Sequence, residues 1–468
     1  MTGENVLSVV VVLCLCYLVV TTLVALAFVI VGAVENAFRK LEDESTDYST
    51  LGASRFTVPV SVIVAAYNEE RVIESTVRSL LDFDYPEFEV VVVNDGSSDG
   101  TLERLKDSFG LEPYQVFVRH VFESQPIRSV YRSADYPNLV LVDKENGGKA
   151  DSWNAGLNVV RYRYVCGVDA DTVFDRRALL KVMRVAVQDP ARTLGVTSQI
   201  TTARDPERAI SAKPGRRVVE RGPLAVYQHL DFVRAFVNNR LAWSKLGFML
   251  CAPGGFQIWR RDVLEEVGGY STSFTCEDIE LTFRVHETFL REGRDYEIYC
   301  LPDSIGVTES PDTYSKLIAQ RERWQRVIDE TVVHYRRMWF NRRYKSVGLV
   351  GAPFYLVSEV ISPAIEMVAL VALVAAVALG LFAFPTFLLV LGAMAFTNAA
   401  LTAAAILLDD VQSRLYRKRD LARLLAYAPF DVVVYRPIMF WARIKGTWRY
   451  LRRDKGWYKF ERNVRPAT

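Results

Sequence analysis

The stretch VSVIVAAYNEE, residues 60–70, begins as a short apolar run of mainly β-branched residues and ends in polar ones. Such a run predicts a buried strand of a parallel sheet. Three similar runs follow it: EVVVVND (89–95), NLVLVD (138–143) and YVCGVDA (164–170). Between the first two, Asn68 suits a helix N-cap and Glu69 and Glu70 suit a first helical turn, so a helix is expected to begin there. The alternation predicts a doubly wound α/β domain with a mostly parallel sheet.

Polar residues gather where these strands end. They are Tyr67, Glu69, Asp95, Lys149, Asp169 and Asp171. Because ligands bind at the carboxyl ends of parallel strands, we expect these side chains to share one crevice. Carboxylates that converge repel one another, and a divalent cation or a nucleotide would relieve that repulsion. The Asp-x-Asp pair suits Mg²⁺ or Mn²⁺, although the pair alone is a weak signal. The spacings of a P-loop and of a dinucleotide fingerprint are absent.

Composition places the chain in a mixed class. Half of its 468 residues are hydrophobic and 24% are charged, which excludes a disordered chain and a protein made only of membrane spans. A net charge of +2 gives no indication of a nucleic-acid partner. The six cysteines form no CxxC pair, so neither a disulfide framework nor a zinc site is expected.

Two apolar zones predict membrane helices. Residues 6–34 carry no charge, and a helix of that length exceeds the roughly 30 Å of a bilayer core. The second zone, 348–408, is interrupted by prolines and predicts an interfacial helix near 349–362 and spans near 364–382 and 386–408. Asn398 in the last span is interpreted as a partner in an interhelical hydrogen bond.

Basic residues predict the orientation of the chain. Arg414, Arg417, Lys418 and Arg419 follow the last span, which places that side in the cytoplasm. The segment 421–442 is apolar but has basic clusters at both ends, which favours a helix on the membrane surface or a re-entrant one over a third span. Residues 39–348 are then cytoplasmic, in a multi-pass protein of the cell membrane that contacts lipid.

Seven motifs in order resemble one family. They are VSVIVAAYNEE (60–70), VVVVNDGSSDGT (90–101), DKENGGKADSWNAGLN (143–158), VDADT (168–172), GGFQIWRRDVLEEVGGY (254–270), TCEDIELTFRVHE (275–287) and QRERW (320–324). The set resembles membrane-embedded family-two glycosyltransferases, in particular the processive cellulose, chitin, hyaluronan and poly-N-acetylglucosamine synthases. An uncharacterised bacterial branch is the most similar, since PFYLVSEVISPAIE (353–366) and GWYKFER (456–462) also have counterparts there.

The resemblance implies how a UDP-sugar donor is bound. Tyr67 and Glu69 would face the uridine, and Asp95 the uracil edge. Lys149 would lie near the donor. Asp169 would help to hold the nucleotide or the sugar.

The resemblance also implies residues for the metal and for catalysis. Asp171, with Asp169, would bind Mg²⁺ or Mn²⁺ on the diphosphate. In the TCED motif Asp278 would be the general base, with Glu277 beside it. Gln320 and Arg323 would flank the diphosphate, and Trp324 would present its ring to the acceptor sugar. Direct displacement would invert the anomeric centre and give a β-linked product.

The family layout gives a division of the chain. It predicts an N-terminal transmembrane helix (1–40), a linker (41–58), a GT-A-type, Rossmann-like cytoplasmic domain (59–312), interfacial helices carrying QRERW (313–363), two transmembrane helices (364–408) and a basic C-terminal segment (409–468). The acceptor would be a growing polysaccharide or a lipid-linked sugar. Cellulose synthases have more spans, so a homo-oligomer or an export partner is an open alternative.

The donor sugar is not identified by the sequence. N-acetylglucosamine is preferred because the layout is nearest to poly-N-acetylglucosamine synthases. Two other functions are left open: transfer of a single sugar to a lipid-linked acceptor, and a non-catalytic membrane transport or scaffold subunit. The complete set of acidic motifs argues against the second.

Overall fold

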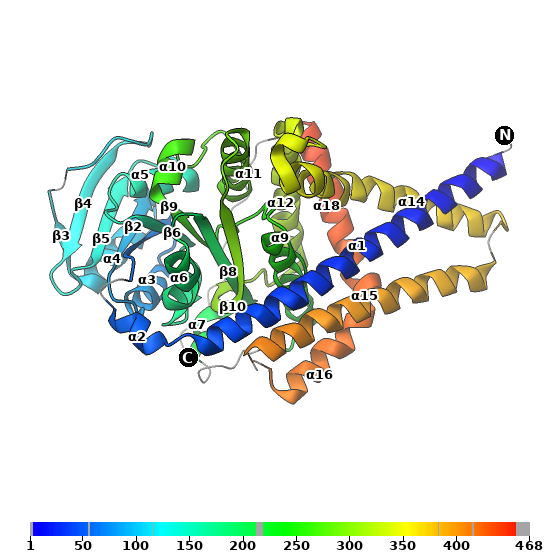
Figure 1. Cartoon of the computed structure of the whole chain (residues 1–468), viewed down its shortest axis with the longest axis horizontal. Coiled ribbons are helices and arrows are strands. Elements are labelled where there is room, and N and C mark those ends of the chain that lie inside the picture. The colour runs from blue at the N-terminus through cyan, green and yellow to red at the C-terminus, as the bar shows by residue number, and fades with distance from the viewer. Residues whose placement is uncertain are drawn as a thin grey trace.

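A computed structural model describes residues 3–54, 57–115, 117–211, 219–381, 383–413 and 416–454. Its centre is a ten-stranded sheet with the order β3-β4-β5-β2-β1-β6-β9-β8-β10-β7 (Figure 1). The strands are β1 (Val60–Ala66), β2 (Phe88–Asp95), β3 (Leu111–Pro113), β4 (Ile127–Ser133), β5 (Leu139–Lys144), β6 (Tyr164–Asp169), β7 (Thr172–Phe174), β8 (Thr193–Ala203), β9 (Phe256–Arg260) and β10 (Glu297–Glu309).

The four predicted strands form one parallel block of this sheet, and β8 and β10 form a second parallel pair. β5, β2, β1 and β6 lie side by side and run in the same direction. The sheet as a whole is mixed, because β4 and β9 run antiparallel to their neighbours. A short connection joins β4 to β5, and short connections produce antiparallel pairs. The sequence of β4, IRSVYRS, has no apolar run that would have revealed it.

Helices cover both faces of the sheet because the strands are apolar on both sides. Val62 and Val64 pack on one face with α3, whereas Ile63 packs on the other with Trp153 of α5. The helices of this domain are α3 (Ile73–Leu81), α4 (Thr101–Phe109), α5 (Lys149–Leu157), α6 (Ala178–Gln188), α7 (Pro206–Ser211), α8 (Pro223–Val233), α9 (Leu241–Lys245), α10 (Arg261–Val267) and α11 (Glu277–Arg291).

The first of these helices begins later than predicted. Val72 is the N-cap of α3, and Asn68 has a left-handed backbone with φ +54°. Asn tolerates this conformation better than most residues do. Its Oδ1 accepts a hydrogen bond of 2.7 Å from the Ser98 N–H, so the side chain joins two loops instead of capping a helix.

In the part of the chain that the structure describes, three helices are long and apolar enough to cross a membrane: Val9–Ser45, Val347–Ala378 and Phe384–Val411. The first belongs to α1 (Gly3–Ser45) and the third to α15 (Phe384–Ser413). The second comprises short helical segments, among them α13 (Ala352–Tyr355), and then α14 (Ser362–Ala378). A π-helical turn, Leu356–Ile361, precedes Pro363. Such a turn accommodates the hydrogen bond that proline cannot donate.

Helix α1 continues from the apolar region onto the α/β domain, beside α14 and α15 (Figure 1). A Cβ at Gly32 would lie 2.6 Å from the Val237 carbonyl oxygen, so glycine permits this close crossing. The Asn36 Nδ2 and the Lys40 Nζ then donate hydrogen bonds of 3.0 and 2.8 Å to carbonyls near the end of α15. The segment predicted as a linker contains the end of α1 and helix α2 (Tyr48–Ala53).

The C-terminal helices are α16 (Lys418–Tyr427), α17 (Asp431–Val434) and α18 (Arg436–Leu451), and α18 packs against α12 (Tyr314–His334). Asn398 in α15 donates a hydrogen bond of 3.0 Å to the buried Asp431, which confirms the predicted interhelical contact. Arg414 and the GWYKFER stretch lie outside the described residues.

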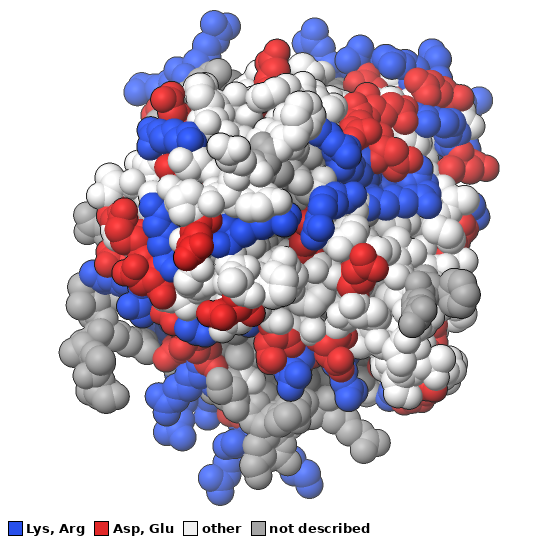
Figure 2. All heavy atoms as spheres, turned by 90° about the vertical axis from the view of Figure 1, so that its left-hand side faces the viewer, with Lys and Arg blue, Asp and Glu red and all other residues white. Residues whose placement is uncertain are grey.

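Charge separates the two ends of the molecule. The face opposite the apolar helices carries interspersed basic and acidic side chains (Figure 2). The helices α1 and α15 instead expose large apolar side chains, such as Leu13 and Leu389 at 63% and 72%. Exposed apolar helices of this kind are compatible with lipid and not with water.

Candidate active site

A lysine joins the end of β6 to the start of α11. Lys149 Nζ lies 2.6 Å from Asp169 Oδ1 and 2.9 Å from Glu277 Oε1. It also lies 4.6 Å from the centre of the Trp153 ring, a cation–π distance. Burial opposes the charged amine, but Asp169 and Glu277 raise the pKa of Lys149 well above its usual range. The two carboxylates therefore favour the charged form of Lys149.

The predicted base, Asp278, lies next to this lysine group. The Gly254 N–H donates a hydrogen bond of 2.9 Å to Asp278 Oδ2. A Cβ at Gly254 would lie 2.8 Å from Lys149 Nζ and 3.2 Å from Glu277 Oε1. Only glycine lets the backbone approach the three charged groups this closely. The TCED motif begins α11, where a helix N-terminus favours carboxylates.

Asp95 is buried and holds a loop. Its Oδ1 accepts from the Gly147 N–H (2.9 Å) and from Lys144 Nζ (2.5 Å). Its Oδ2 accepts from the Gly148 N–H (2.8 Å) and from Asn146 Nδ2 (3.2 Å). The four acceptor positions of a carboxylate are thus filled by the loop before Lys149. The predicted contact with uracil would require one of these donors to move.

Sequence reasoning missed Lys144 and its second partner. The Lys144 side chain is fully buried and lies 2.5 Å from Asp151 Oδ1 as well as from Asp95. A lysine at the end of a strand is usually solvated, so nothing in the sequence indicated a buried cation.

Tyr67 and Glu69 lie in the turn after β1. Tyr67 is 39% exposed. The Glu69 N–H donates to Thr101 Oγ1 at 2.8 Å, which ties this turn to the start of α4. Both residues are therefore at the edge of the sheet where the resemblance places the uridine.

Asp171 follows β6 in the sequence and contacts Thr308 of β10. Its Oδ1 accepts from Thr308 Oγ1 at 3.2 Å. Among the described residues no group of three or more His, Cys, Asp or Glu forms a metal cage. A pair of carboxylates is instead the set that Mg²⁺ or Mn²⁺ uses when phosphate oxygens complete its shell. Asp169 and Asp171 fit such an ion.

The QRERW residues lie on α12, against α8. The Trp324 ring packs 6.4 Å from Phe232, and the Arg321 guanidinium lies 4.1 Å over it. Gln320 Oε1 is buried and accepts no hydrogen bond from the described residues. Arg323 is half-buried. The contacts described for Trp324 run to Phe232 of α8 and to Arg321 of its own helix.

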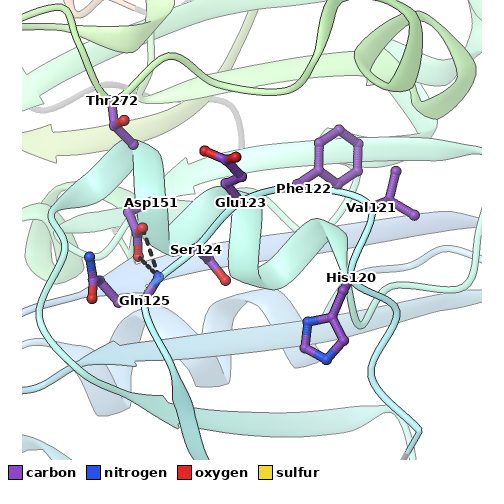
Figure 3. Close-up of a pocket in the computed structure, with 8 residues that line it drawn as sticks. All are labelled: His120, Val121, Phe122, Glu123, Ser124, Gln125, Asp151 and Thr272. Atoms are coloured by element: carbon purple, nitrogen blue, oxygen red, sulfur yellow. Dashed lines mark hydrogen bonds between the residues drawn. The ribbon is translucent and has the colours of Figure 1, made fainter.

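A pocket of about 480 Å³ is lined by Asp151, Thr272 and residues 120–125 (Figure 3). The Gln125 N–H donates to both Asp151 oxygens, at 2.9 and 3.2 Å. Thr272 approaches the pocket from the loop before TCED, as Figure 3 shows. A Cβ at Gly147 would clash with the side chains of Asp151 and Gln125. These two pocket residues therefore also pack against the glycine loop.

The mixed sheet and the acidic residues at its parallel strand ends define a GT-A-type α/β domain. Residues 61–268 match the model of glycosyl transferase family 2, so the chain contains a family-two glycosyltransferase domain. A mannosyltransferase from Pyrobaculum calidifontis, solved with GDP-Man and Mn²⁺, has a similar fold. Its TM-score is 0.54 at 19% identity, and the match covers 92% of this chain and 98% of that one.

Curated relatives carry a more specific name. The poly-beta-1,6-N-acetyl-D-glucosamine synthase of Staphylococcus epidermidis is 26% identical over 302 residues, 64% of this chain and 61% of that protein. The enzyme of the same name from Staphylococcus aureus strain COL is 25% identical over 266 residues, 57% of this chain and 53% of that protein. The match thus spans less than two thirds of the length of these relatives.

Proposed function

We propose that the protein transfers N-acetylglucosamine from a UDP-sugar to a growing β-linked polysaccharide, with inversion, at the cytoplasmic face of the cell membrane. The observation that carries this proposal is the group formed by Lys149, Asp169, Glu277 and Asp278 in a family-two domain. Two kinds of support add to it: the poly-beta-1,6-N-acetyl-D-glucosamine synthases among its relatives, and the apolar helices that flank the domain.

Each residue of the group has a chemical task. Asp278 removes the proton of the acceptor hydroxyl as that oxygen attacks the anomeric carbon. The leaving UDP gains negative charge, which Lys149 and Arg323 stabilise. A divalent cation held by Asp169 and Asp171 would neutralise the diphosphate when bound. Trp324 offers an apolar ring face to the acceptor sugar.

The base is tested with Asp278→Asn. We expect transfer to fall by about 1,000-fold or more because the amide accepts no proton. UDP binding should persist, because Asp278 contacts the acceptor side. The measurement is the initial rate with labelled UDP-N-acetylglucosamine, with UDP affinity by calorimetry. Asp262→Asn, at an exposed position of α10, is the matched control. Full turnover in Asp278→Asn would refute the assignment.

The metal ligand is tested with Asp171→Ala. We expect Mn²⁺ to strengthen UDP binding to the wild-type protein but not to this variant, because one of two carboxylate ligands is gone. Titration of UDP with and without Mn²⁺ measures this directly, without turnover. Asp107→Ala, on the exposed side of α4, should keep the metal effect. An unchanged metal effect in Asp171→Ala would contradict the proposal.

The sugar and the product are tested together. A screen of labelled UDP-sugars with the purified protein identifies the donor, and linkage-specific glycosidases identify the bond. Long products on a gel support polymer synthesis. A single added sugar on a lipid would instead establish the alternative function, and no transfer or hydrolysis of any UDP-sugar would favour a non-catalytic membrane subunit.

A further inference from the structure

The two oxygens of Asp278 differ in their hydrogen bonds. Oδ1 accepts from the Cys276 thiol at 3.1 Å and from the Ile279 N–H at 2.7 Å. Oδ2 accepts from the Gly254 N–H at 2.9 Å. Each carboxylate oxygen has about two acceptor positions. Among the described residues, Oδ1 is therefore fully used, whereas Oδ2 keeps one position for a further donor.

We propose that Oδ2 of Asp278 is the atom that takes the acceptor proton, and that Cys276 is a positioning residue that keeps Oδ1 turned away from the acceptor. This inference rests on the proposed function, in which Asp278 is the base. No bond to sulfur forms or breaks: the thiol keeps its proton throughout, and the hydroxyl proton moves to Oδ2.

The position of Cys276 supports this task. It is the N-cap residue of α11, where a polar side chain usually accepts a hydrogen bond from the helix. The Cys276 side chain makes no such capping bond and instead faces Asp278. Burial raises the pKa of the Cys276 thiol well above its usual range, and Asp278 and Glu277 raise it further. The thiol thus stays protonated and remains a donor.

The choice of a thiol has a consequence for the base. A hydrogen bond to a carboxylate stabilises its charged form and makes it a weaker base. A thiol is a weak donor, so it orients Asp278 with less of this effect than a hydroxyl would have. Cys276 therefore orients the Asp278 carboxylate through a weak hydrogen bond.

Other ionisable groups face the same carboxylate. Lys149 approaches it from α5, and Glu277 is its neighbour on α11. Tyr270, Cys251 and Tyr355 interact with it electrostatically from the surrounding loops and helices. None of these groups changes in a Cys276 variant, so a difference between the variants reports on the thiol.

The test compares the pH profiles of kcat/KM for wild type, Cys276→Ala and Cys276→Ser. Loss of the donor in Cys276→Ala should move the acidic limb to higher pH by about half to one unit. The stronger hydroxyl donor in Cys276→Ser should move it to lower pH. KM for the UDP-sugar should stay within about twofold, because the donor site is untouched. Cys300→Ala, at a buried position on β10, is the control for loss of a thiol.

Two results would overturn the proposal: coincident acidic limbs in all three proteins, or an upward shift in both variants. Asp278→Asn in the same assay separates this failure from that of the proposed function. If Asp278→Asn is inactive while the limbs coincide, only the role of Cys276 is wrong. If Asp278→Asn turns over fully, the base itself is wrong.

Discussion

Lys144 and Lys149 lie at the two ends of one glycine loop, and each is held between two carboxylates. Around Lys144 everything is buried: its side chain is 0% exposed, and those of Asp95 and Asp151 are 4% and 6% exposed. Each ion pair there measures 2.5 Å. The same group also binds the loop backbone through Asp95.

The group around Lys149 is open on one side. The Lys149 side chain is 29% exposed and that of Asp169 is 34% exposed. Solvent therefore reaches these charges. Two similar charge patterns five residues apart therefore differ in their accessibility: the closed group around Lys144 holds the loop, and the open group around Lys149 leaves room for a ligand.

The largest effect is expected from Lys144→Met. It leaves two buried carboxylates without a cation, which costs about 3–5 kcal/mol of unfolding free energy. Denaturant unfolding of the solubilised protein measures this. Lys181→Met, at a half-exposed position of α6, should change stability by less than about 0.5 kcal/mol. Equal unfolding free energies for Lys144→Met and Lys181→Met would show that the buried Lys144 group does not stabilise the fold.

A second effect is expected from Lys149→Met. Transfer should fall by about 100-fold, since a cation beside the leaving diphosphate is lost. The unfolding free energy should fall by less than half as much as in Lys144→Met, because water solvates the exposed Asp169. Initial rates and the same unfolding assay give both numbers. A Lys149→Met variant that is active but strongly destabilised would show that Lys149 stabilises the fold and not the leaving diphosphate.

The smallest effect is expected from a change at Asp329. This buried carboxylate accepts hydrogen bonds from two neutral donors. It accepts from Gln325 Nε2 (2.9 Å) and Thr447 Oγ1 (2.7 Å) between α12 and α18. Burial raises its pKa from 3.8 to about 6, although these two hydrogen bonds oppose the rise. Because the folded-state pKa is the higher one, the penalty is full above pH 6 and disappears as the pH falls toward 4.

Asp329→Asn should therefore stabilise the protein at pH 7.5 by at most about 2–3 kcal/mol and by about half as much at pH 5. Thermal unfolding at the two pH values checks this, with Asp107→Asn on exposed α4 as the control. A loss of stability at both pH values would mean that the Asp329 carboxylate is held as favourably as the carboxylates beside Lys144. Paired and unpaired buried charges would then not differ in stability.

Apolar runs predicted the strands that position the site, because burial on both faces requires such runs. They did not predict β4, whose polar sequence is held by its neighbour β5, or the turn at Asn68, whose side chain bonds a distant loop. Such choices depend on contacts far along the chain.

The residues of the candidate site were likewise predicted only in part. Strand ends placed the acidic residues at one edge, and the structure brings Lys149, Asp169 and Glu277 together there. Lys144 and Cys276 were missed, since their partners are visible only in three dimensions. The individual roles of the predicted site residues stay predictions.

The length of α1 has a consequence for the whole molecule. At about 1.5 Å per residue, the part of α1 from Gly32 to Ser45 extends about 20 Å past its crossing with Val237. Asn36 and Lys40 fix its rotation by holding the end of α15. The α/β domain is thus held at a fixed angle to the apolar helices α1 and α15.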